Sequence, residues 1–526
     1  MGELEVLSSS QVRLLDENSM ALGISPLQLM EAAGKSVADF IASKMDMKGK
    51  RAVVVCGTGN NGGDGFVTAR YLASMGSHVT VILLGRESDI RTEEARRNWS
   101  ILKGLRLTVK LYEAPDEEHL MRIKDLILGA DIIVDAIFGI GFKGMARPPH
   151  STAIRLMNQS KGFKVAVDIP SGLEADTAEV HGEAFKAHAT ITFQAVKPSL
   201  LKVKEYVGEL IVARIGIPIE AMYLVGLSDV RRCFKKRDIF AKKGDHGRVV
   251  IVGGSVNYTG APALAAFAAL KMGVDLALIL TPKEAVAPIR AYSPDLIVTP
   301  LSSRENLSLS DVPLVLSACE RADALIIGPG LGLHEETVRS VREIVAKVEV
   351  PMIIDADALK ALSGYLDLIK GKRAVLTPHS KEFEILTGIP FPPPEDLQGR
   401  LRVAKDVAKE YALTFLVKGR EDVITDGQRV KVNMTGNALM TVGGTGDVLT
   451  GIIAALIANG IAPFEAACAG AFINGLAGDI VASHKVFITA RTLIEFIQDA
   501  VKLILKDFQV VERSQVFNAL FSKGGS

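Results

Sequence analysis

Three segments in the first half of the chain place oxygen-bearing side chains directly after runs of β-branched residues. Asn61 lies in a polar glycine loop, residues 57–65, and two later runs end at Asp135 and Asp168, the second followed closely by Ser171. The carboxyl ends of parallel strands converge on one crevice of an open sheet, so we expect these four side chains to gather there. Oxygen ligands without His or Cys favour a hard cation such as K⁺, Mg²⁺ or Ca²⁺. Taken singly, an aspartate at a strand end is often only a helix cap.

The same loop has the form of a dinucleotide-binding pattern. Gly57, Gly59 and Gly62 show the GxGxxG spacing between a strand-like and a helix-like segment, and the acidic residue expected to follow would be Glu87. This signal is weak by itself. The three polar side chains inside the loop suit a bound cation or a specific ligand better than a bare pyrophosphate. A tight turn stabilised by its own Asn and Asp side chains is the alternative.

The second half carries a more explicit chemical signal. Residues 443–447 (GGTGD) lead directly into an apolar helical segment. Backbone N–H groups at a helix N-terminus, together with the helix dipole, form a site for a phosphate. Asp447 beside such a site could accept the proton of an attacking hydroxyl, which is the general-base step of phosphoryl transfer. The alternative is a purely structural helix start. No Walker A loop competes, since Leu29 stands where a glycine must precede Gly34-Lys35-Ser36.

The elements that must position these residues alternate between strands and helices in both halves. Ser10 could cap a first helix that runs to Leu22, and Ser25 precedes Pro26 at the start of a second one. Strand-like runs of the first half cover residues 51–55, 78–85, 131–138, 163–169, 189–195 and 208–215. Those of the second half cover 248–255, 324–332, 351–359, 373–382 and 414–419, followed by a hairpin around Asp426-Gly427 and helices over 445–459 and 465–483. This order predicts the α/β class, with two parallel-sheet α/β/α domains.

Composition limits the classes of protein that fit. The 526 residues are 48% hydrophobic and 23% charged, which is typical of a globular chain and excludes wholesale disorder. The formal net charge of +1 gives no electrostatic reason to expect nucleic acid or a membrane as a partner. A basic stretch, residues 231–243, could bind nucleic acid but is more typical of a linker or a domain edge. The most apolar stretch, 260–280, contains Lys271 and Asp275 and is too charged to span a bilayer.

The cysteines and the N-terminus bear on the compartment. The four cysteines are dispersed, with neither a CxxC pair nor zinc-site spacing, and we interpret them as reduced core thiols. The N-terminal segment is acidic and polar, unlike a signal peptide. We therefore expect a cytoplasmic protein.

Three motifs of the first half recur, in the same order, in one known family. The segments NNGGDG (60–65), GIGFKGMARPP (139–149) and VDIPSG (167–172) resemble the N-terminal domain of the NAD(P)H-hydrate epimerases over about residues 5–215. The resemblance implies a Rossmann-like domain, assigned to residues 1–220, in which Asp168 is the catalytic acid/base and Asn61, Asp135 and Ser171 hold K⁺. It also implies that the hydrated dinucleotide contacts Asp168 and two segments, Asn60, Asn61, Gly62, Gly63 and Asp64, and Gly139, Ile140, Gly141, Phe142, Lys143, Gly144 and Met145.

The second half resembles the ADP/ATP-dependent NAD(P)H-hydrate dehydratases of the ribokinase superfamily, over roughly residues 230–505. The motifs that carry this resemblance are KGDHGRVVIVGGS (243–255), TGAP (259–262), GPGLG (328–332), DADAL (355–359), TPHSKE (377–382), VKG (417–419) and GTGD (444–447). The implied ribokinase-like domain is assigned to residues 221–510. The residues implied to contact the hydrated dinucleotide are Ala261, Gly332, His379 and the catalytic Asp447. Those implied to lie against the nucleotide are Lys418, Gly419, Arg420, Glu421, Asp422, Thr445 and Gly446. Where that family has a Thr near position 422, this chain has Glu421-Asp422.

Together the two resemblances imply a bifunctional repair enzyme for NADH and NADPH that have gained water on the nicotinamide ring. The N-terminal domain would interconvert the R and S hydrates. The C-terminal domain would consume ADP to phosphorylate the ring hydroxyl of the S form, after which phosphate is eliminated and NAD(P)H returns. The resemblance implies ADP as phosphoryl donor, Mg²⁺ for the nucleotide's charge and K⁺ in the epimerase site. We expect a homo-oligomer and neither nucleic acid nor a membrane as a partner.

Two other classes of function fit parts of the sequence. A small-alcohol kinase of the ribokinase superfamily, fused to a non-catalytic dinucleotide-binding domain, would release a stable phosphorylated product rather than inorganic phosphate. Alternatively, the N-terminal half could be a binding module without activity. The retention of Asn61, Asp135, Asp168 and Ser171 together speaks against that second alternative.

Overall fold

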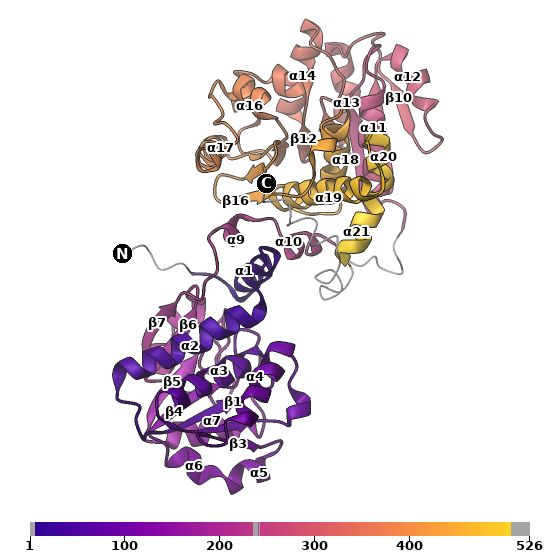
Figure 1. The fold of residues 1–526 in the computed structure, drawn as a ribbon. Helices are drawn as coiled ribbons and strands as arrows, with labels where there is room; N and C mark the ends of the chain where they lie inside the picture. Colours follow the sequence, from indigo (N-terminus) through magenta and orange to yellow (C-terminus); the bar gives the residue numbers. More distant parts are fainter. Residues whose placement is uncertain (1–5, 235–239, 241, 506–526) are drawn as a thin grey trace. The chain divides into compact units, whose positions relative to one another are not determined.

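The computed structural model describes residues 6–234, 240 and 242–505 and divides the chain into two compact units, Met1–Ala221 and Met222–Ser526 (Figure 1). Part of the basic stretch 231–243 and the end of the predicted C-terminal domain, residues 506–510, lie outside the described residues. Each unit is built around its own sheet, as the alternation of strands and helices predicts.

The N-terminal unit contains a seven-stranded sheet in the order β3-β2-β1-β4-β5-β6-β7, in which every pairing is parallel. The strands are β1 (Arg51–Cys56), β2 (His78–Leu83), β3 (Val109–Glu113), β4 (Ile132–Ala136), β5 (Phe163–Val167), β6 (Ala189–Phe193) and β7 (Glu209–Ala213). The helices are α1 (Ser9–Ala21), α2 (Pro26–Lys44), α3 (Asn60–Ser74), α4 (Glu93–Gly104), α5 (Glu117–Arg122), α6 (Lys124–Leu128), α7 (His150–Gln159) and α8 (Lys204–Val207), with α9 (Glu220–Tyr223) at the boundary of the unit.

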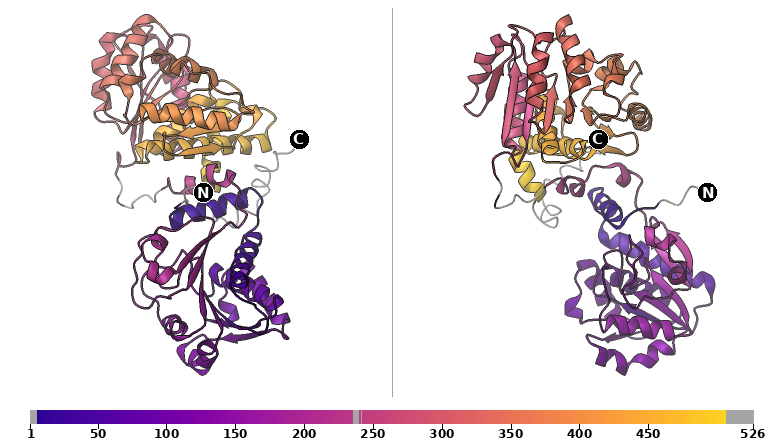
Figure 2. Two further views of the ribbon diagram at one scale, coloured as in Figure 1. Left: turned by 90° about the vertical axis from the view of Figure 1, so that its left-hand side faces the viewer. Right: turned by 180° about the vertical axis from the view of Figure 1, so that it is seen from behind.

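Helices cover both faces of this sheet (Figure 2). Helices α2, α3 and α4 pack together on one face. On the other face, Val53 and Val55 of β1 join a buried apolar cluster with side chains of α5, α6 and α7. Strands buried on both faces read as continuous runs of β-branched residues, and this is why most of them could be recognised in the sequence.

The C-terminal unit contains a nine-stranded sheet in the order β10-β9-β8-β11-β12-β13-β14-β15-β16. The strands are β8 (Arg248–Val252), β9 (Leu276–Thr281), β10 (Ile297–Pro300), β11 (Ala324–Ile327), β12 (Met352–Ile354), β13 (Ala374–Leu376), β14 (Thr414–Val417), β15 (Asp422–Thr425) and β16 (Val430–Asn433). The first seven in this order pair in parallel, and β14-β15-β16 pair antiparallel, with the predicted hairpin turn at Asp426-Gly427 between β15 and β16.

Two layers of helices enclose this second sheet. The helices are α10 (Leu227–Arg231), α11 (Gly260–Lys271), α12 (Lys283–Arg290), α13 (Val312–Cys319), α14 (Glu335–Lys347), α15 (Asp357–Ala361), α16 (Ser380–Thr387), α17 (Leu397–Tyr411), α18 (Thr445–Ala458), α19 (Pro463–His484), α20 (Ala490–Glu495) and α21 (Ile497–Leu505). Helices α11, α18 and α19 pack on one face, and α13 to α17 contribute to the apolar cluster on the other. Among the described residues, α19 alone is long and apolar enough to cross a membrane, and most of it is buried inside the unit.

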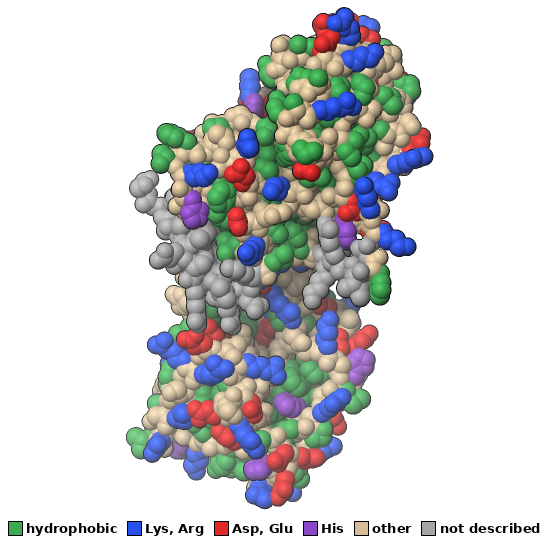
Figure 3. Space-filling view, turned by 90° about the vertical axis from the view of Figure 1, so that its right-hand side faces the viewer, with side chains coloured by type: hydrophobic (Ala, Val, Ile, Leu, Met, Phe, Trp, Pro, Cys, Tyr) green, Lys and Arg blue, Asp and Glu red, His purple; other side chains and the backbone are tan. Residues whose placement is uncertain are grey.

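The first helix begins differently from the prediction. Its N-cap is Ser8, whose side chain and that of Gln11 form a reciprocal capping box, so the predicted cap at Ser10 is wrong. Ser25 and Pro26 begin α2 as predicted. The four cysteines are free and buried, as the sequence suggested. On the face in Figure 3, acidic and basic side chains are interspersed, in keeping with the net charge of +1.

Candidate active sites

The first candidate site lies where the strand order of the N-terminal unit reverses, between β1 and β4. Asp135, near the end of β4, is fully buried, and its carboxylate accepts hydrogen bonds from the Ser171 N–H (2.7 Å) and hydroxyl (2.6 Å). The Asn61 side-chain amide donates to the Phe138 carbonyl at 2.9 Å, and the Phe138 N–H donates to Ser171 Oγ, also at 2.9 Å. The structure thus brings together the three residues predicted to bind K⁺.

The environment of Asp135 suits a cation. Burial raises the pKa of its carboxyl group to about 6, although the hydrogen bonds from Ser171 oppose that change. No described Lys, Arg or His forms an ion pair with Asp135. A buried carboxylate with amide and hydroxyl oxygens beside it is a donor set for a hard cation, and K⁺ fits it.

Asp168 immediately follows β5 and has a φ of 65°, a left-handed conformation that is uncommon for a residue other than glycine. Its Oδ1 accepts hydrogen bonds from the Thr192 hydroxyl (3.1 Å), the Phe193 N–H (3.2 Å) and the ammonium group of Lys197. Lys197 is fully buried. Lys197 was not predicted to belong to the site; the signal that could have found it is a lysine in the segment FQAVKPSL (193–200), directly after a buried strand.

Two further carboxyl groups interact electrostatically with Asp168. Burial, followed by the negative charge of Asp168, raises the pKa of Asp16 on α1 to about 7. The same two causes raise the pKa of Asp64 in the first turns of α3 well above its usual range. Asp64 was predicted to lie in the site, whereas Asp16 was not. Carboxyl groups whose pKa values are raised by burial and by a neighbouring carboxylate are typical of acid/base sites.

The glycines of the first loop serve packing as well as ligand access. A Cβ on Gly62 would lie 1.9 Å from the Gly57 carbonyl oxygen, and one on Gly57 would lie 2.2 Å from the Ile137 carbonyl oxygen. Gly63 lies against Met30 of α2. Only Gly59, the N-cap of α3, faces open space. Glycines are therefore needed in the GxGxxG pattern because the loop packs closely on itself and on the end of β4, in addition to any contact with a dinucleotide.

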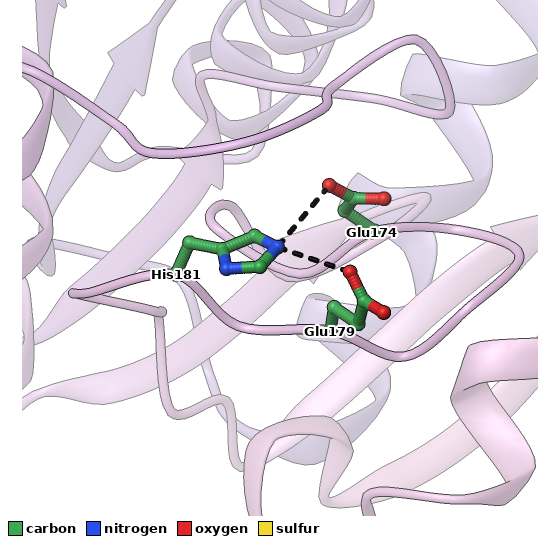
Figure 4. A group of neighbouring side chains, drawn as sticks. All are labelled: Glu174, Glu179 and His181. Atoms are coloured by element: carbon green, nitrogen blue, oxygen red, sulfur yellow. Dashed lines mark hydrogen bonds and ion pairs between the residues drawn. The ribbon is translucent and has the colours of Figure 1, made fainter.

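The predicted substrate segment 139–145 is fixed at both ends. Phe142 stacks on Phe138 with ring centroids 4.6 Å apart, and the Gly144 N–H donates to Glu174 Oε1 at 2.7 Å. Glu174 also belongs to a small group with Glu179 and His181 (Figure 4). His181 Nε2 lies 3.0 Å from Glu179 and 3.8 Å from Glu174. Glu179 and His181 are exposed, and the group supports the substrate segment through Glu174 alone.

The second candidate site lies at the carboxyl ends of β12 and β14 in the C-terminal unit. Lys418, after β14, donates to Asp355 Oδ1 at 2.9 Å, and Asp355 follows β12. Burial lowers the pKa of Lys418, but the charge and hydrogen bond of Asp355, together with the charges of Glu382 and Asp447, more than offset this effect and raise the pKa. Asp447, in the first turn of α18, interacts with both residues. Burial and the negative charge of Asp355 raise its pKa to about 7, against a smaller opposing effect of Lys418.

The start of α18 gives this site its backbone. Gly444, the N-cap, has a φ of 94°, and a Cβ there would lie 2.7 Å from the Leu264 side chain on α11. A Cβ on Gly446 would lie 3.4 Å from Lys418 Nζ, so the helix start, Lys418 and Asp447 adjoin. Thr445, by contrast, uses its hydroxyl internally, on the Met440 and Val442 carbonyls (3.1 Å each).

The other predicted dehydratase residues occupy neighbouring strand ends. Ala261 lies in the first turn of α11, one turn before Leu264, and 3.4 Å from where a Cβ on Gly330 would be. In the same loop after β11, the Gly332 N–H donates to Asp357. His379 caps α16: its Nδ1 accepts from the Lys381 and Glu382 N–H groups, while 55% of its side chain is exposed.

Residues 418–422, predicted to contact a nucleotide, contain both exposed and buried side chains. Arg420 is largely exposed. Asp422 accepts hydrogen bonds from the Gly419 N–H (3.1 Å) and the Asn433 side chain (3.0 Å), and burial raises its pKa to about 6. Its carboxylate therefore holds the turn, which explains how an aspartate can stand where the similar family has a Thr. Two cavities of about 530 and 640 Å³ lie elsewhere in the unit, and no predicted site residue lines them.

Comparison with known proteins finds two family models on the chain. Residues 249–499 match NAD(P)H-hydrate dehydratase, and residues 26–199 match the YjeF-related protein N-terminus. Helix α1, which carries Asp16, precedes the second match.

Curated relatives match both units at once. A bifunctional NAD(P)H-hydrate repair enzyme from Pyrobaculum aerophilum is 47% identical over 94% of this chain and 97% of its own length. Enzymes of the same name from Hyperthermus butylicus and Archaeoglobus fulgidus are 42% and 40% identical, over 94% and 95% of this chain and 92% and 99% of their own lengths. Among solved structures, a ribokinase-like superfamily protein from Enterococcus faecalis is 25% identical over 55% of this chain and 98% of its own, with a TM-score of 0.48.

Proposed function

Because the chain belongs to the bifunctional NAD(P)H-hydrate repair enzymes, we propose that Asp168 and Asp447 are its two catalytic residues, one in each unit. The N-terminal unit is the epimerase domain and the C-terminal unit the dehydratase domain. The observation that carries the proposal is the position of Asp447: a carboxyl group with a pKa of about 7, in the first turn of α18, beside the Asp355–Lys418 pair.

In the dehydratase site, ionised Asp447 removes the proton from the ring hydroxyl of the S hydrate. The hydroxyl oxygen attacks the terminal phosphorus of ADP, and the bond from that phosphorus to the bridging oxygen breaks. The N–H groups at the start of α18 stabilise the charge on the transferred phosphoryl group. The ring nitrogen then expels inorganic phosphate, with loss of a ring proton, and NAD(P)H is restored.

Support for the ligand contacts comes from where the segments lie. Lys418, Gly446 and Asp447 adjoin one another, so the nucleotide phosphates fit between the turn after β14 and the start of α18. Ala261, Gly332 and His379, on neighbouring strand ends, are assigned to the hydrated dinucleotide. The carboxylate of Asp355, which contacts Lys418, is an oxygen donor that would help to hold Mg²⁺, and the ion would supply charge neutralisation on the phosphates.

In the epimerase site, Asp168 exchanges a proton with the hydrated ring. Asn61, Asp135 and Ser171 would hold K⁺, which would supply a positive charge beside the buried Asp135 carboxylate. The loop at the start of α3 and the segment 139–145 bind the dinucleotide. Support comes from the convergence of these segments where the strand order reverses, which is where open α/β sheets bind ligands.

One assay with two arms tests these assignments. Chemically hydrated NADH is incubated with ADP or with ATP, and both the near-ultraviolet absorbance of NADH and free phosphate are followed. We expect absorbance and phosphate to rise together with ADP. A phosphorylated dinucleotide that accumulates without NADH would instead indicate a kinase. In the second arm, epimer exchange is followed by chromatography in K⁺ and in Li⁺, and we expect exchange to require K⁺.

A further inference from the structure

Lys197 is a lysine with no access to solvent. It lies four residues beyond the end of β6, just before a short 3₁₀ turn, Pro198–Leu201, and none of its surface is exposed. Its ammonium group donates to Asp168 Oδ1, to the Thr192 hydroxyl at 2.9 Å and to the Phe193 carbonyl at 3.0 Å. All three N–H donors are therefore used, in an arrangement that suits a charged ammonium group.

The same hydrogen bonds orient the carboxylate of Asp168. Its Oδ1 receives three donors, from Lys197, Thr192 and the Phe193 backbone. Its Oδ2 has no hydrogen-bond partner among the described residues. One oxygen is thus anchored in the protein, and the other is left for a ligand.

This arrangement has a cost that packing alone does not explain. A buried ion pair stabilises a fold no better than apolar side chains of similar volume, because both charges must leave water. Asp168 also adopts a left-handed backbone conformation, with a φ of 65°, which is unfavourable for an aspartate. Both costs involve one residue at a strand end, whose charge also raises the pKa values of Asp16 and Asp64. Strain of this kind is typical of a functional position.

We propose that Lys197 is a positioning residue of the epimerase reaction: it holds the Asp168 carboxylate by Oδ1, with Oδ2 directed at the hydrated nicotinamide ring. This inference rests on the proposed role of Asp168. The proton that the reaction moves passes between Asp168 Oδ2 and the substrate, and no bond to Lys197 forms or breaks. Thr192 bridges the two groups, since its hydroxyl donates to Asp168 and accepts from Lys197.

The test compares full-length variants in K⁺ with both hydrates present. Lys197→Met removes the charge and the donors while filling similar volume, and we expect kcat for epimer exchange to fall roughly 10- to 100-fold, as when the group that orients a functional ligand is removed. KM should change little, because Lys197 does not touch the substrate. Lys197→Arg restores a cation and should recover part of kcat. Thr192→Val should lower kcat less than Lys197→Met.

Two internal controls separate a positioning role from loss of the fold. The dehydratase site of the same chain reports the active enzyme concentration, and Trp99, the single tryptophan, lies in α4 and reports the folding of the N-terminal unit by its fluorescence. Parent kcat in Lys197→Met, or losses in all three variants that only follow the folded fraction, would overturn the inference. Parent kcat in Asp168→Asn would instead overturn the proposed role of Asp168 itself.

Discussion

At the scale of single residues, the two candidate sites share one charge arrangement. In each, an aspartate that follows a strand is paired with a lysine that follows another strand of the same sheet: Asp168 with Lys197, and Asp355 with Lys418. In each, a further aspartate in the first turns of a glycine-rich helix has a raised pKa because of burial and that strand-end carboxylate. A carboxylate held by a cation, beside a carboxyl group whose pKa is raised, is an arrangement suited to accepting or delivering a proton.

The raised pKa of Asp447 sets the pH dependence of dehydration. A general base must be ionised, so kcat/KM for the S hydrate should reach a plateau above pH 7 and fall about tenfold per pH unit below it. Lys418 lowers the pKa of Asp447, so Lys418→Met should move this acid limb to higher pH. An acid limb at the same pH in Lys418→Met as in the parent enzyme would contradict the assignment.

Asp447→Asn should reduce the rate of dehydration by at least about 100-fold and leave epimer exchange intact.

The sequence predicts the individual residues unevenly. Asn61, Asp135 and Ser171 could be grouped in advance, because each follows a recognisable strand and parallel strands end at one edge. Lys197 and Asp16 could not, because their partnership with Asp168 arises only when three separate segments fold together. His379 was singled out only by its motif, and the structure adds a second role for it, as the cap of α16.

At the scale of elements, most of the strands that the sequence reveals are buried on both faces, and the edge strand β7 is an exception. The strands β3 and β10 were not predicted, because they are edge strands whose residues are partly exposed and lack a continuous apolar run. Residues 260–280 form one apolar stretch in the sequence, whereas in the structure the turn at Gly273, with a φ of 89°, divides it into α11 and β9. Periodicity cannot locate such a division when both elements are apolar.

The glycine pair before α18 offers a matched test of the helix start. Gly444→Ala should lower the free energy of unfolding of the C-terminal unit by about 2 kcal/mol or more, since its φ is 94° and the new Cβ would overlap Leu264 and Ala490. Gly443→Ala, with nothing within 4 Å, should change it by less than about 0.5 kcal/mol. Urea unfolding followed by circular dichroism measures both.

Trp99 provides the control for this pair. Because it lies in the N-terminal unit, its fluorescence transition should be unchanged in both glycine variants. Equal stability of the two variants would show that the start of α18 tolerates a side chain at the N-cap, against the geometry described above.

At the scale of the whole molecule, the chain combines two compact units, each with its own sheet and its own candidate site. Each site is assembled within one unit: residues 16–197 supply the groups around Asp168, and residues 261–447 supply those around Asp447. Neither site uses a large basic surface. Helix starts and backbone N–H groups can hold anionic dinucleotides in a chain of net charge +1.

Because each site lies within one unit, two full-length variants, each with one inactive site, should complement each other when they are mixed. Asp168→Asn should dehydrate the S hydrate at the parent rate but consume the R hydrate only as fast as it exchanges spontaneously. Asp447→Asn should exchange the hydrates and dehydrate neither. An equal mixture of the two variants should convert both hydrates completely, as followed by NADH absorbance. R hydrate that remains unconverted in the mixture would show that the two reactions must occur on one chain.

The burial of Lys197 and Asp168 affects how the enzyme should respond to ionic strength. Dissolved ions screen exposed charges over about 8 Å at physiological salt, but they cannot enter between two groups that are packed inside the protein. Salt should therefore slow the encounter of an anionic dinucleotide with the enzyme while leaving the rate of the bound substrate almost untouched. The epimerase site should therefore keep its kcat at high salt concentration, whereas kcat would fall in an enzyme whose catalytic carboxylate depended on surface lysines.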